Sequence, residues 1–383
     1  MSKPAAAKAK KKSKSMRLFE SAPIDLVFFA MVIVILAIGL VMLMSASHYS
    51  SMYKYGDSYY EIKRQLVFAG IGLAVMFIAS RVNYRILRFA AVPLYGVSGL
   101  MLAAVLVVGT GKNTEKRWID LGPVTFQPSE IAKFALILFL AWYITKYAKD
   151  MHKFFKGLVV PGIFVVAYMG LIIIEPHLSG AIIVALVGLT LMVVGGTRMF
   201  YMFGLGGVVG AIGLFILSKT SYMQARINIW LHPESDPLGG GFQVLQALYA
   251  IGSGGLFGLG VGNSRQKRLY IPEPQNDYIF PIICEELGFI GALLIIALFV
   301  LLIYRGFVIA MKAPDRFGAL LCYGIVSMVA YQVLLNVMVV TNTLPPTGIS
   351  LPFFSAGGTA LVILMAEMGV VLSVSRQARL EKG

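Results

Sequence analysis

Apolar runs of about 20 residues recur along this chain of 383 residues. A helix needs about that length to cross the roughly 30 Å hydrocarbon core of a bilayer. The chain is 58% hydrophobic and only 13% charged, which makes it far more apolar than an ordinary soluble domain. We therefore predict an all-α polytopic membrane protein with about ten transmembrane helices. The predicted spans are residues 24–45, 65–80, 89–109, 128–147, 158–174, 180–196, 199–218, 281–304, 317–340 and 356–374.

The N-terminal residues 1–23 are rich in lysine and resemble the first part of a signal peptide. The apolar region of a signal peptide covers only about 7–15 residues, however, and the run at 24–45 is longer. We therefore predict a basic cytoplasmic tail followed by an uncleaved first helix. A single transmembrane domain at 24–375 and a second cytoplasmic tail at 376–383 complete the predicted organisation.

The distribution of basic residues predicts the orientation. With ten spans and a cytoplasmic N-terminus, 21 Lys and Arg residues fall on the inner side and 11 on the outer side. This excess agrees with the positive-inside rule, so both termini are predicted to be cytoplasmic. The formal net charge of +15 then reflects topology and attraction to anionic lipid headgroups, and we predict no nucleic-acid partner.

Cysteine and histidine give no sign of a metal centre. Cys284 and Cys322 are far apart in the sequence, which suggests neither a disulfide framework nor a cysteine-rich site. The histidines lie in four different predicted loops without the spacing typical of zinc ligands. They are His48, His152, His177 and His232.

The longest predicted loop covers residues 219–280 and falls on the outer side. Loops of this length are usually functional or disordered. Disorder is disfavoured here because residues 242–250 form an apolar helical stretch, which six glycines follow between 252 and 262. Such a segment enters a membrane only where protein or a water-filled cavity satisfies its backbone. We predict a partly helical, partly re-entrant loop that packs on the helix bundle.

Two further loops fall on the same side. The loop at 111–130 leads into the predicted helix that holds Lys133, and Pro128 suits the first turn of that helix. Glu130 favours the same helix N-terminus through the macrodipole. The loop at 342–360 has no charge but is rich in Pro, Gly and small hydroxyl residues, which is typical of rigid irregular backbone beside a ligand or pore.

Acidic residues are concentrated around Asp277, where the large loop meets an apolar helix. If that helix begins near residue 276, Asp277 lies in its first turn. Its negative charge would then stabilise the helix by about 0.3–1 kcal/mol through the macrodipole. That role does not explain Glu285 and Glu286, which lie deeper in the same helix. Ionisable residues at a membrane boundary are costly, so we favour a functional site at Asp277. One of the two glutamates faces the same cavity, or they pair with Lys133 or an arginine.

The outer loops also carry cations that suit an anionic, phosphate-containing ligand. Contact with solvent or with lipid headgroups is the alternative for each of them. Lys133 lies about one turn inside a predicted span, so it either snorkels outward or meets an anion. The candidates are Lys112, Lys116, Arg117, Lys133, Arg226, Arg265, Lys267 and Arg268.

Trp118 follows Arg117 at a predicted membrane interface. An aromatic anchor at the interface is the common role for such a residue. Contact with a carbohydrate or a lipid is the sharper alternative.

Four stretches of sequence resemble the SEDS family, the shape, elongation, division and sporulation proteins that polymerise peptidoglycan glycan strands. The wording PEPQNDYIF in the second stretch is more similar to the division and sporulation branch than to the rod-elongation branch. The stretches are RWIDLGPVTFQPSEIAKF at 117–134, EPHLSG at 175–180, the segment 236–291 and PPTGISLPFFSAGGTA at 345–360.

The resemblance implies an inverting glycosyltransferase that acts on lipid II in the bacterial cytoplasmic membrane. Asp277 matches the family's essential acid, and Trp118 matches its loop tryptophan. A class B penicillin-binding protein with transpeptidase activity, and other division or elongation proteins, are the implied partners. The chain departs from the family pattern at His177, at Ser179 with Gly180, and at the pair Thr359 and Ala360.

The mechanism that follows uses Asp277 as the general base on the sugar hydroxyl of the acceptor. We expect substrate contacts from Arg117, Trp118, Glu130, Lys133, Arg226, Lys267, Arg268 and Glu286. No cofactor is certain, and a divalent cation, Mg²⁺ or Mn²⁺, is an open alternative. A flippase for a lipid-linked sugar is the rival function, and a scaffold for partner helices is the third.

Overall fold

The computed structural model describes residues 23–110, 117–120, 122, 125–175, 177–204, 206–207 and 221–380. Two predicted cations, Lys112 and Lys116, lie outside these residues. So do almost all of the predicted basic tail and the end of the predicted C-terminal tail. The predicted span at 199–218 also lies mostly outside them, although 199–204 and 206–207 are helical.

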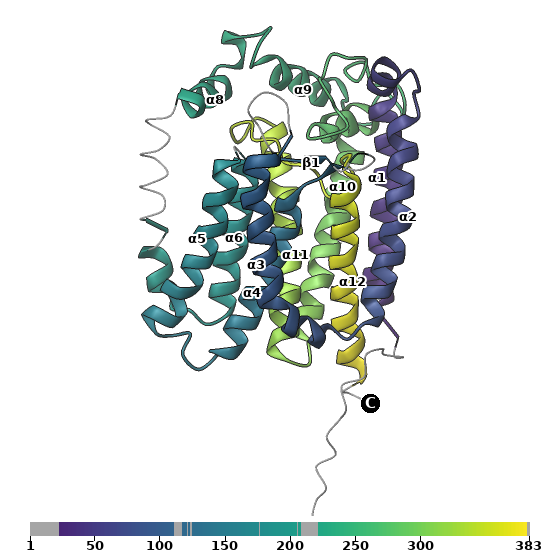
Figure 1. The fold of residues 1–383 in the computed structure, drawn as a ribbon. Coiled ribbons are helices and arrows are strands. Elements are labelled where there is room, and N and C mark those ends of the chain that lie inside the picture. Colours follow the sequence, from purple (N-terminus) through teal and green to yellow (C-terminus); the bar gives the residue numbers. More distant parts are fainter. Residues whose placement is uncertain are drawn as a thin grey trace, which may run out of the picture.

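Nine long helices form the bundle in the described part of the chain (Figure 1). Eight segments are long and apolar enough to cross a membrane, and α6 is a shorter apolar helix. The predicted all-α polytopic fold is therefore confirmed. The helices are α1 (Leu26–Tyr55), α2 (Tyr60–Arg81), α3 (Leu87–Val108), α4 (Pro128–Lys146), α5 (Val160–Ile174), α6 (Leu178–Val194), α10 (Ile279–Met311), α11 (Arg316–Val340) and α12 (Gly358–Leu380).

Local sequence explains where these helices begin and end. Asp25 caps α1 by accepting a hydrogen bond from the Phe28 amide at 3.0 Å, and Gly56 ends the helix with a left-handed φ of 70°. Pro128 occupies the first turn of α4, as predicted, because it has no amide hydrogen to leave unpaired there. Short helical turns precede α3 and α5, namely η1 (Tyr84–Ile86) and η2 (Phe154–Val159).

The core of the bundle surrounds α4 and α11, whose spans are each 72% buried. Residue 25, at the start of α1, meets the end of α12, where the Asp25 amide donates to Ser375 Oγ at 3.2 Å. Arg305 near the end of α10 pairs with Asp25 at 2.7 Å. The two ends of the described chain therefore lie at the same end of the bundle (Figure 1).

The opposite end carries the irregular segments. The short helices α8 (Ser221–Leu231) and α9 (Phe242–Ser253) lie across this end of the bundle, and α9 contacts α10 (Figure 1). The turn η3 (Pro233–Ser235) connects them. The strands β1 (Ile119–Asp120) and β2 (Thr125–Phe126) pair antiparallel nearby. The prediction of a partly helical large loop is confirmed.

The glycine-rich segment that follows α9 packs into a break in α10. Gly288 interrupts that helix with a φ of 69°. The Leu259 amide donates to the Glu285 carbonyl and the Phe289 amide donates to the Gly255 carbonyl, at 2.9 and 2.8 Å. A side chain at Gly258 would collide with this backbone. The loop thus satisfies its polar backbone against the bundle, as predicted.

Candidate functional site

A cleft of about 580 Å³ lies at the end of the bundle that carries the loops. All three predicted loops, 111–130, 219–280 and 342–360, contribute to its wall, so their predicted clustering is confirmed. The first turns of α2, α4 and α6 complete it. Five of the predicted site residues line the cleft, namely Arg117, Trp118, Glu130, Lys133 and Asp277.

Asp277 lies on the cleft wall two residues before α10 begins at Ile279. The prediction that it belongs to the first helical turn is therefore wrong, and a first-turn contact with the macrodipole does not explain this acid. Its backbone is held from the side of α11: the Asn336 amide donates to the carbonyls of Asp277 and Ile349 at 3.0 and 2.6 Å. Asn336 is fully buried, so this link fixes the two loops relative to each other.

Lys133 forms an ion pair with Glu130 at 2.9 Å on the same face of α4. The lysine side chain is only 4% exposed, so it meets an anion and does not snorkel outward. A buried charge is costly without a partner, which explains why a carboxylate lies one turn away. The pair places one cation and one acid together at the floor of the cleft.

Arg117 and Trp118 are positioned by a short backbone bridge. The amide and the carbonyl of Trp118 exchange hydrogen bonds with Thr110 at 3.2 and 2.7 Å. Arg117 donates from Nε to the Glu175 carbonyl at 3.2 Å. Both side chains are half-buried and line the cleft, so Trp118 presents its ring to the same space as Asp277. This position fits a substrate contact better than a membrane anchor.

The loop before α6 adds two buried titratable groups. Burial raises the pKa of Glu175 to about 8, against the opposing charge of Arg117. Burial, with the nearby charges of Arg117 and Lys133, lowers the pKa of His177 to about 3. His177 lines the cleft as a neutral ring, and its Nδ1 lies 3.5 Å from Gln127 Nε2 and from Ser129 Oγ.

Sequence analysis missed three polar residues on α2 that line the cleft, Glu61, Arg64 and Gln65. Arg64 is half-buried and donates to Thr125 Oγ1 at 3.5 Å. Gln65 is 4% exposed and accepts a hydrogen bond from the Gly357 amide at 3.3 Å. A charged residue about one turn into an apolar helix was the available signal for Arg64, as it was for Lys133.

Arg226 and Arg268 do not line the cleft. Arg226 on α8 donates to the Pro346 carbonyl and so braces the loop that follows α11. Arg268 is exposed and lies over the Tyr49 ring at 5.8 Å. Their predicted contacts with a substrate remain predictions.

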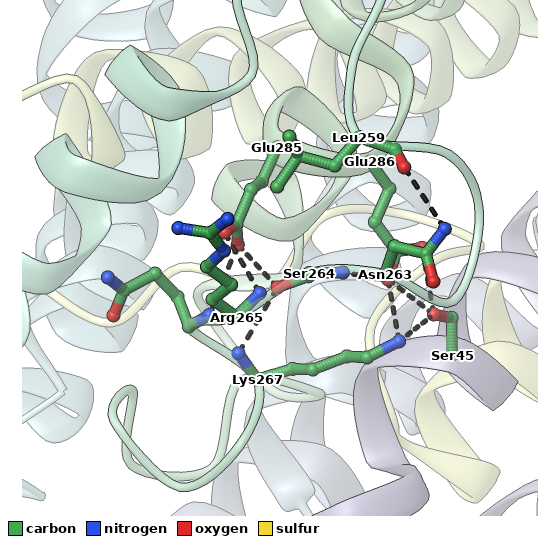
Figure 2. A network of polar contacts seen from close by, with 9 residues as sticks. Ser45, Leu259, Asn263, Ser264, Arg265, Lys267, Glu285 and Glu286 are labelled. Carbon is green, nitrogen blue, oxygen red and sulfur yellow. Dashed lines mark hydrogen bonds and ion pairs between the residues drawn. The ribbon is translucent and has the colours of Figure 1, made fainter.

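Lys267 and Glu286 also lie outside the cleft, in a buried network that joins α1 to α10 (Figure 2). Lys267 Nζ pairs with Glu286 Oε1 at 2.7 Å and donates to Ser45 Oγ at the same distance. Lys267 is 2% exposed and Glu286 is fully buried, so neither reaches the cleft. Of the two alternatives for Glu286, the ion pair is the one found, although its partner is Lys267 and not Lys133 or an arginine.

Glu285 belongs to the same network and caps the turn that holds Lys267 (Figure 2). Its carboxylate accepts from the Arg265 and Gln266 amides at 2.9 and 3.3 Å, and from the Ser264 hydroxyl. The expectation that Glu285 or Glu286 faces the same cavity as Asp277 is therefore wrong, because both carboxylates point to the turn at 264–267.

Comparison with known proteins assigns the chain to a family. A family model described as "Cell cycle protein", which covers FtsW, RodA and SpoVE, matches residues 25–380. Stage V sporulation protein E of Bacillus subtilis is 43% identical over 360 residues, which are 93% of this chain and 98% of that protein. A probable peptidoglycan glycosyltransferase FtsW of Trichlorobacter lovleyi is 37% identical over 94% of this chain and 96% of its own.

Solved structures agree with these relatives. A chain from a peptidoglycan synthase complex that coordinates polymerization and crosslinking superimposes with a TM-score of 0.78 at 31% identity, and 93% of this chain and 98% of that chain are covered. The rod shape determining protein RodA of Thermus thermophilus gives a TM-score of 0.67 at 30% identity, with 92% and 97% covered. The chain therefore belongs to the FtsW, RodA and SpoVE family of polytopic membrane proteins, the SEDS family that its sequence motifs resemble.

Proposed function

We propose that this chain polymerises peptidoglycan glycan strands by inverting glycosyl transfer between lipid II molecules. The observation that carries the proposal is the position of Asp277 on the wall of one cleft with Arg117, Trp118 and Lys133. The relatives named as probable peptidoglycan glycosyltransferases support the reaction class. An acid, an aromatic ring and cations in one cleft suit a sugar joined to a pyrophosphate.

In this mechanism Asp277 accepts the proton from a sugar hydroxyl of the acceptor lipid II. The hydroxyl oxygen then forms a bond to the anomeric carbon of the growing chain. The bond between that carbon and the pyrophosphate oxygen breaks, and its electron pair leaves with the lipid pyrophosphate. An inverting transfer has no covalent intermediate with the protein, so a second catalytic carboxylate is unnecessary. A positioned base of this kind contributes about 10²–10⁴ in rate.

The cations of the cleft would stabilise the departing pyrophosphate. Arg117 and Lys133 were predicted for this role, and Arg64 joins them on the same wall. Arginine presents a planar fork to phosphate oxygens, whereas lysine acts as a point charge. Because Glu130 already pairs with Lys133, it keeps the ammonium group in place at the floor.

A divalent cation, Mg²⁺ or Mn²⁺, fits the cleft only with help from the substrate. Among the described residues no group of three His, Cys, Asp or Glu side chains could hold a metal ion. Mg²⁺ is commonly bound by one or two carboxylates together with substrate phosphates, and Asp277 could supply one carboxylate. When bound, such an ion would add positive charge near the leaving pyrophosphate.

The expected orientation has both termini in the cytoplasm and the cleft on the outer face of the bacterial cytoplasmic membrane. The two ends of the described chain lie together, at the end of the bundle opposite the cleft, which supports this orientation (Figure 1). The peptidoglycan synthase complex among the similar structures supports a class B penicillin-binding protein as the partner. Other division or elongation proteins remain expected partners.

A flippase for lipid-linked precursors is the second candidate. Transporters place their binding groups near the bilayer midplane and open alternately to both sides. Here the cleft residues gather at one end of the bundle, which favours chemistry over transport. Proteoliposomes that contain fluorescent lipid II separate the two functions, since lipid movement without polymer would support the flippase.

The direct test is Asp277→Asn in the purified protein, assayed for glycan chains from lipid II with and without the partner. We expect polymerisation to fall by about 10²-fold or more. Asp57→Asn is the matched control, because Asp57 is a 40% exposed acid in the turn between α1 and α2 and does not line the cleft. Undiminished polymerisation by a folded Asp277→Asn protein would overturn the proposal.

A further inference from the structure

Glu367 is a buried acid on α12 that the proposed reaction does not use. Its side chain is 1% exposed, and neither carboxylate oxygen has a hydrogen-bond partner among the described residues. Predicted spans rarely contain such a group, because an uncompensated charge in this environment costs several kcal/mol. A buried carboxyl group of this kind is stable only when a proton or a bound cation neutralises it.

The Glu367 carboxylate faces a small second cavity of about 50 Å³. A cavity of this size has room for an ion or a few water molecules. Oxygen-bearing side chains share its wall with Glu367, namely Glu130, Gln332, Ser350 and Ser355. Glu130, Gln332 and Ser350 also line the large cleft, so the two spaces adjoin. Ions and water therefore have an entry path from the cleft.

The charges around this cavity do not balance. Glu130 and Glu367 are two carboxylates, and among the described residues the cation that interacts with both is Lys133. Lys133 is engaged with Glu130 at 2.9 Å, so the three groups together carry one uncompensated negative charge when all are ionised. A single positive charge restores neutrality, whereas a divalent ion would leave an excess positive charge in a buried site.

We propose that the cavity below the cleft is a monovalent cation site in which Na⁺ binds Glu367. Hard cations prefer oxygen ligands. The wall offers such oxygens from two carboxylates, two hydroxyl groups and the carbonyl of one side-chain amide. Na⁺ approaches carboxylate oxygens more closely than the larger K⁺ does, so its Coulomb attraction to Glu367 is stronger. The site is separate from Asp277 and does not depend on the proposed glycosyl transfer.

Occupancy of the site would also act on the cleft. Glu130 faces both spaces, so an ion beside Glu367 competes for its carboxylate and weakens its hold on Lys133. The bound ion thus links the membrane-buried part of α12 to the cation at the cleft floor. We expect the binding of the ion to stabilise the fold by mass action.

The test compares purified protein in NaCl, KCl and choline chloride at constant ionic strength, with thermal unfolding as the readout. We expect the melting temperature to rise by a few degrees with Na⁺, in a saturable way, and to stay level with choline. Direct binding of radioactive ²²Na⁺ to the wild-type protein gives a second readout that requires no variant. Neither readout depends on polymerisation.

Glu367→Gln should abolish both the thermal shift and the binding of ²²Na⁺. Glu234→Gln is the matched control, because its side chain is 70% exposed and it should respond to Na⁺ as the wild type does. An absent Na⁺ effect in the wild type, or an unchanged one in Glu367→Gln, would overturn the proposal. A pH dependence of stability that Glu367→Gln removes, together with no response to Na⁺, would overturn it too, since Glu367 would then hold a proton.

Discussion

The carboxylate of Asp277 lies directly against the backbone of Gly348, from the loop that follows α11. A Cβ atom at residue 348 would lie 2.9 Å from Asp277 Oδ2, and the φ of Gly348 is 69°, which glycine adopts most easily. The two residues are far apart in sequence, yet Asn336 also ties their segments together through the carbonyls of Asp277 and Ile349. The loop at 345–349 therefore sets the position of the acid.

Gly348→Ala should lower the rate of polymerisation by about 10- to 100-fold, because displacement of a catalytic group by about 1 Å can have that effect. The added methyl group would push the Asp277 carboxylate out of place. Gly56→Ala is the matched control: its φ of 70° is nearly the same, but a Cβ there meets nothing within 4 Å. Equal losses of activity in the two variants would show that backbone strain, and not contact with Asp277, is responsible.

Lys267→Met should destabilise the fold by about 3–5 kcal/mol, because it leaves the Glu286 carboxylate buried without its cation. Lys267→Met combined with Glu286→Gln should recover part of that loss. Thermal unfolding in detergent measures both. Lys54→Met removes the more exposed ion pair with Glu273 and should cost at most about 1 kcal/mol. A double variant no more stable than Lys267→Met would contradict the ion-pair interpretation.

Glu175 should make the protein less stable as the pH rises. Its pKa is about 8 in the fold and 4.5 in a free side chain, so the folded state keeps a proton that the unfolded chain releases between these values. The free energy of unfolding should therefore fall by on the order of 1 kcal/mol per pH unit from about pH 4.5 to 8. This contribution is present in full below that window.

Glu175→Gln should remove that slope, which is measured as the melting temperature between pH 5 and about pH 8. Glu234→Gln, at a 70% exposed position, should keep the wild-type slope. A wild-type slope in Glu175→Gln would show that another group titrates.

Arg64→Gln should raise KM for lipid II by about 10-fold or more while the fold stays intact, because a hydrogen bond to a charged group is worth about 1.5–3 kcal/mol. Arg64→Lys should restore only part of the loss, since lysine cannot present two parallel donors to a phosphate. Lys63→Gln is the comparison, because Lys63 on the same helix is 67% exposed and does not line the cleft. If Arg64→Gln and Lys63→Gln had the same effect, general surface charge would be the cause.

Much of the architecture could be read from the sequence. Bilayer thickness fixes the length of an apolar span, so the runs around 128–147 and 317–340 predicted α4 and α11 closely. Counting spans then put the three irregular loops on one side, and they do meet around the cleft. Asp277, Lys133 and Trp118 were found because charged or aromatic residues at a membrane boundary are exceptional.

Helical periodicity gave a wrong prediction for Glu285 and Glu286, the two acids that follow Asp277. Their spacing suggested one shared face, but α10 begins only at Ile279, so Asp277 precedes the helix and does not share the helical register of Glu286. Arg64 was missed for a related reason. It is an ordinary charged residue near a helix end until α2 packs beside the hairpin that carries Thr125.

The sequence by itself determined the all-helical membrane fold, the gathering of the three loops at one end and the acid among them, because these depend on local composition and bilayer thickness. Only the tertiary structure decided which charges pair. Glu286 meets Ser45, 241 residues away, and Lys267, 19 residues away, whereas Asp277 meets Gly348. Such choices depend on distances between packed segments, and the order of residues along the chain does not contain those distances.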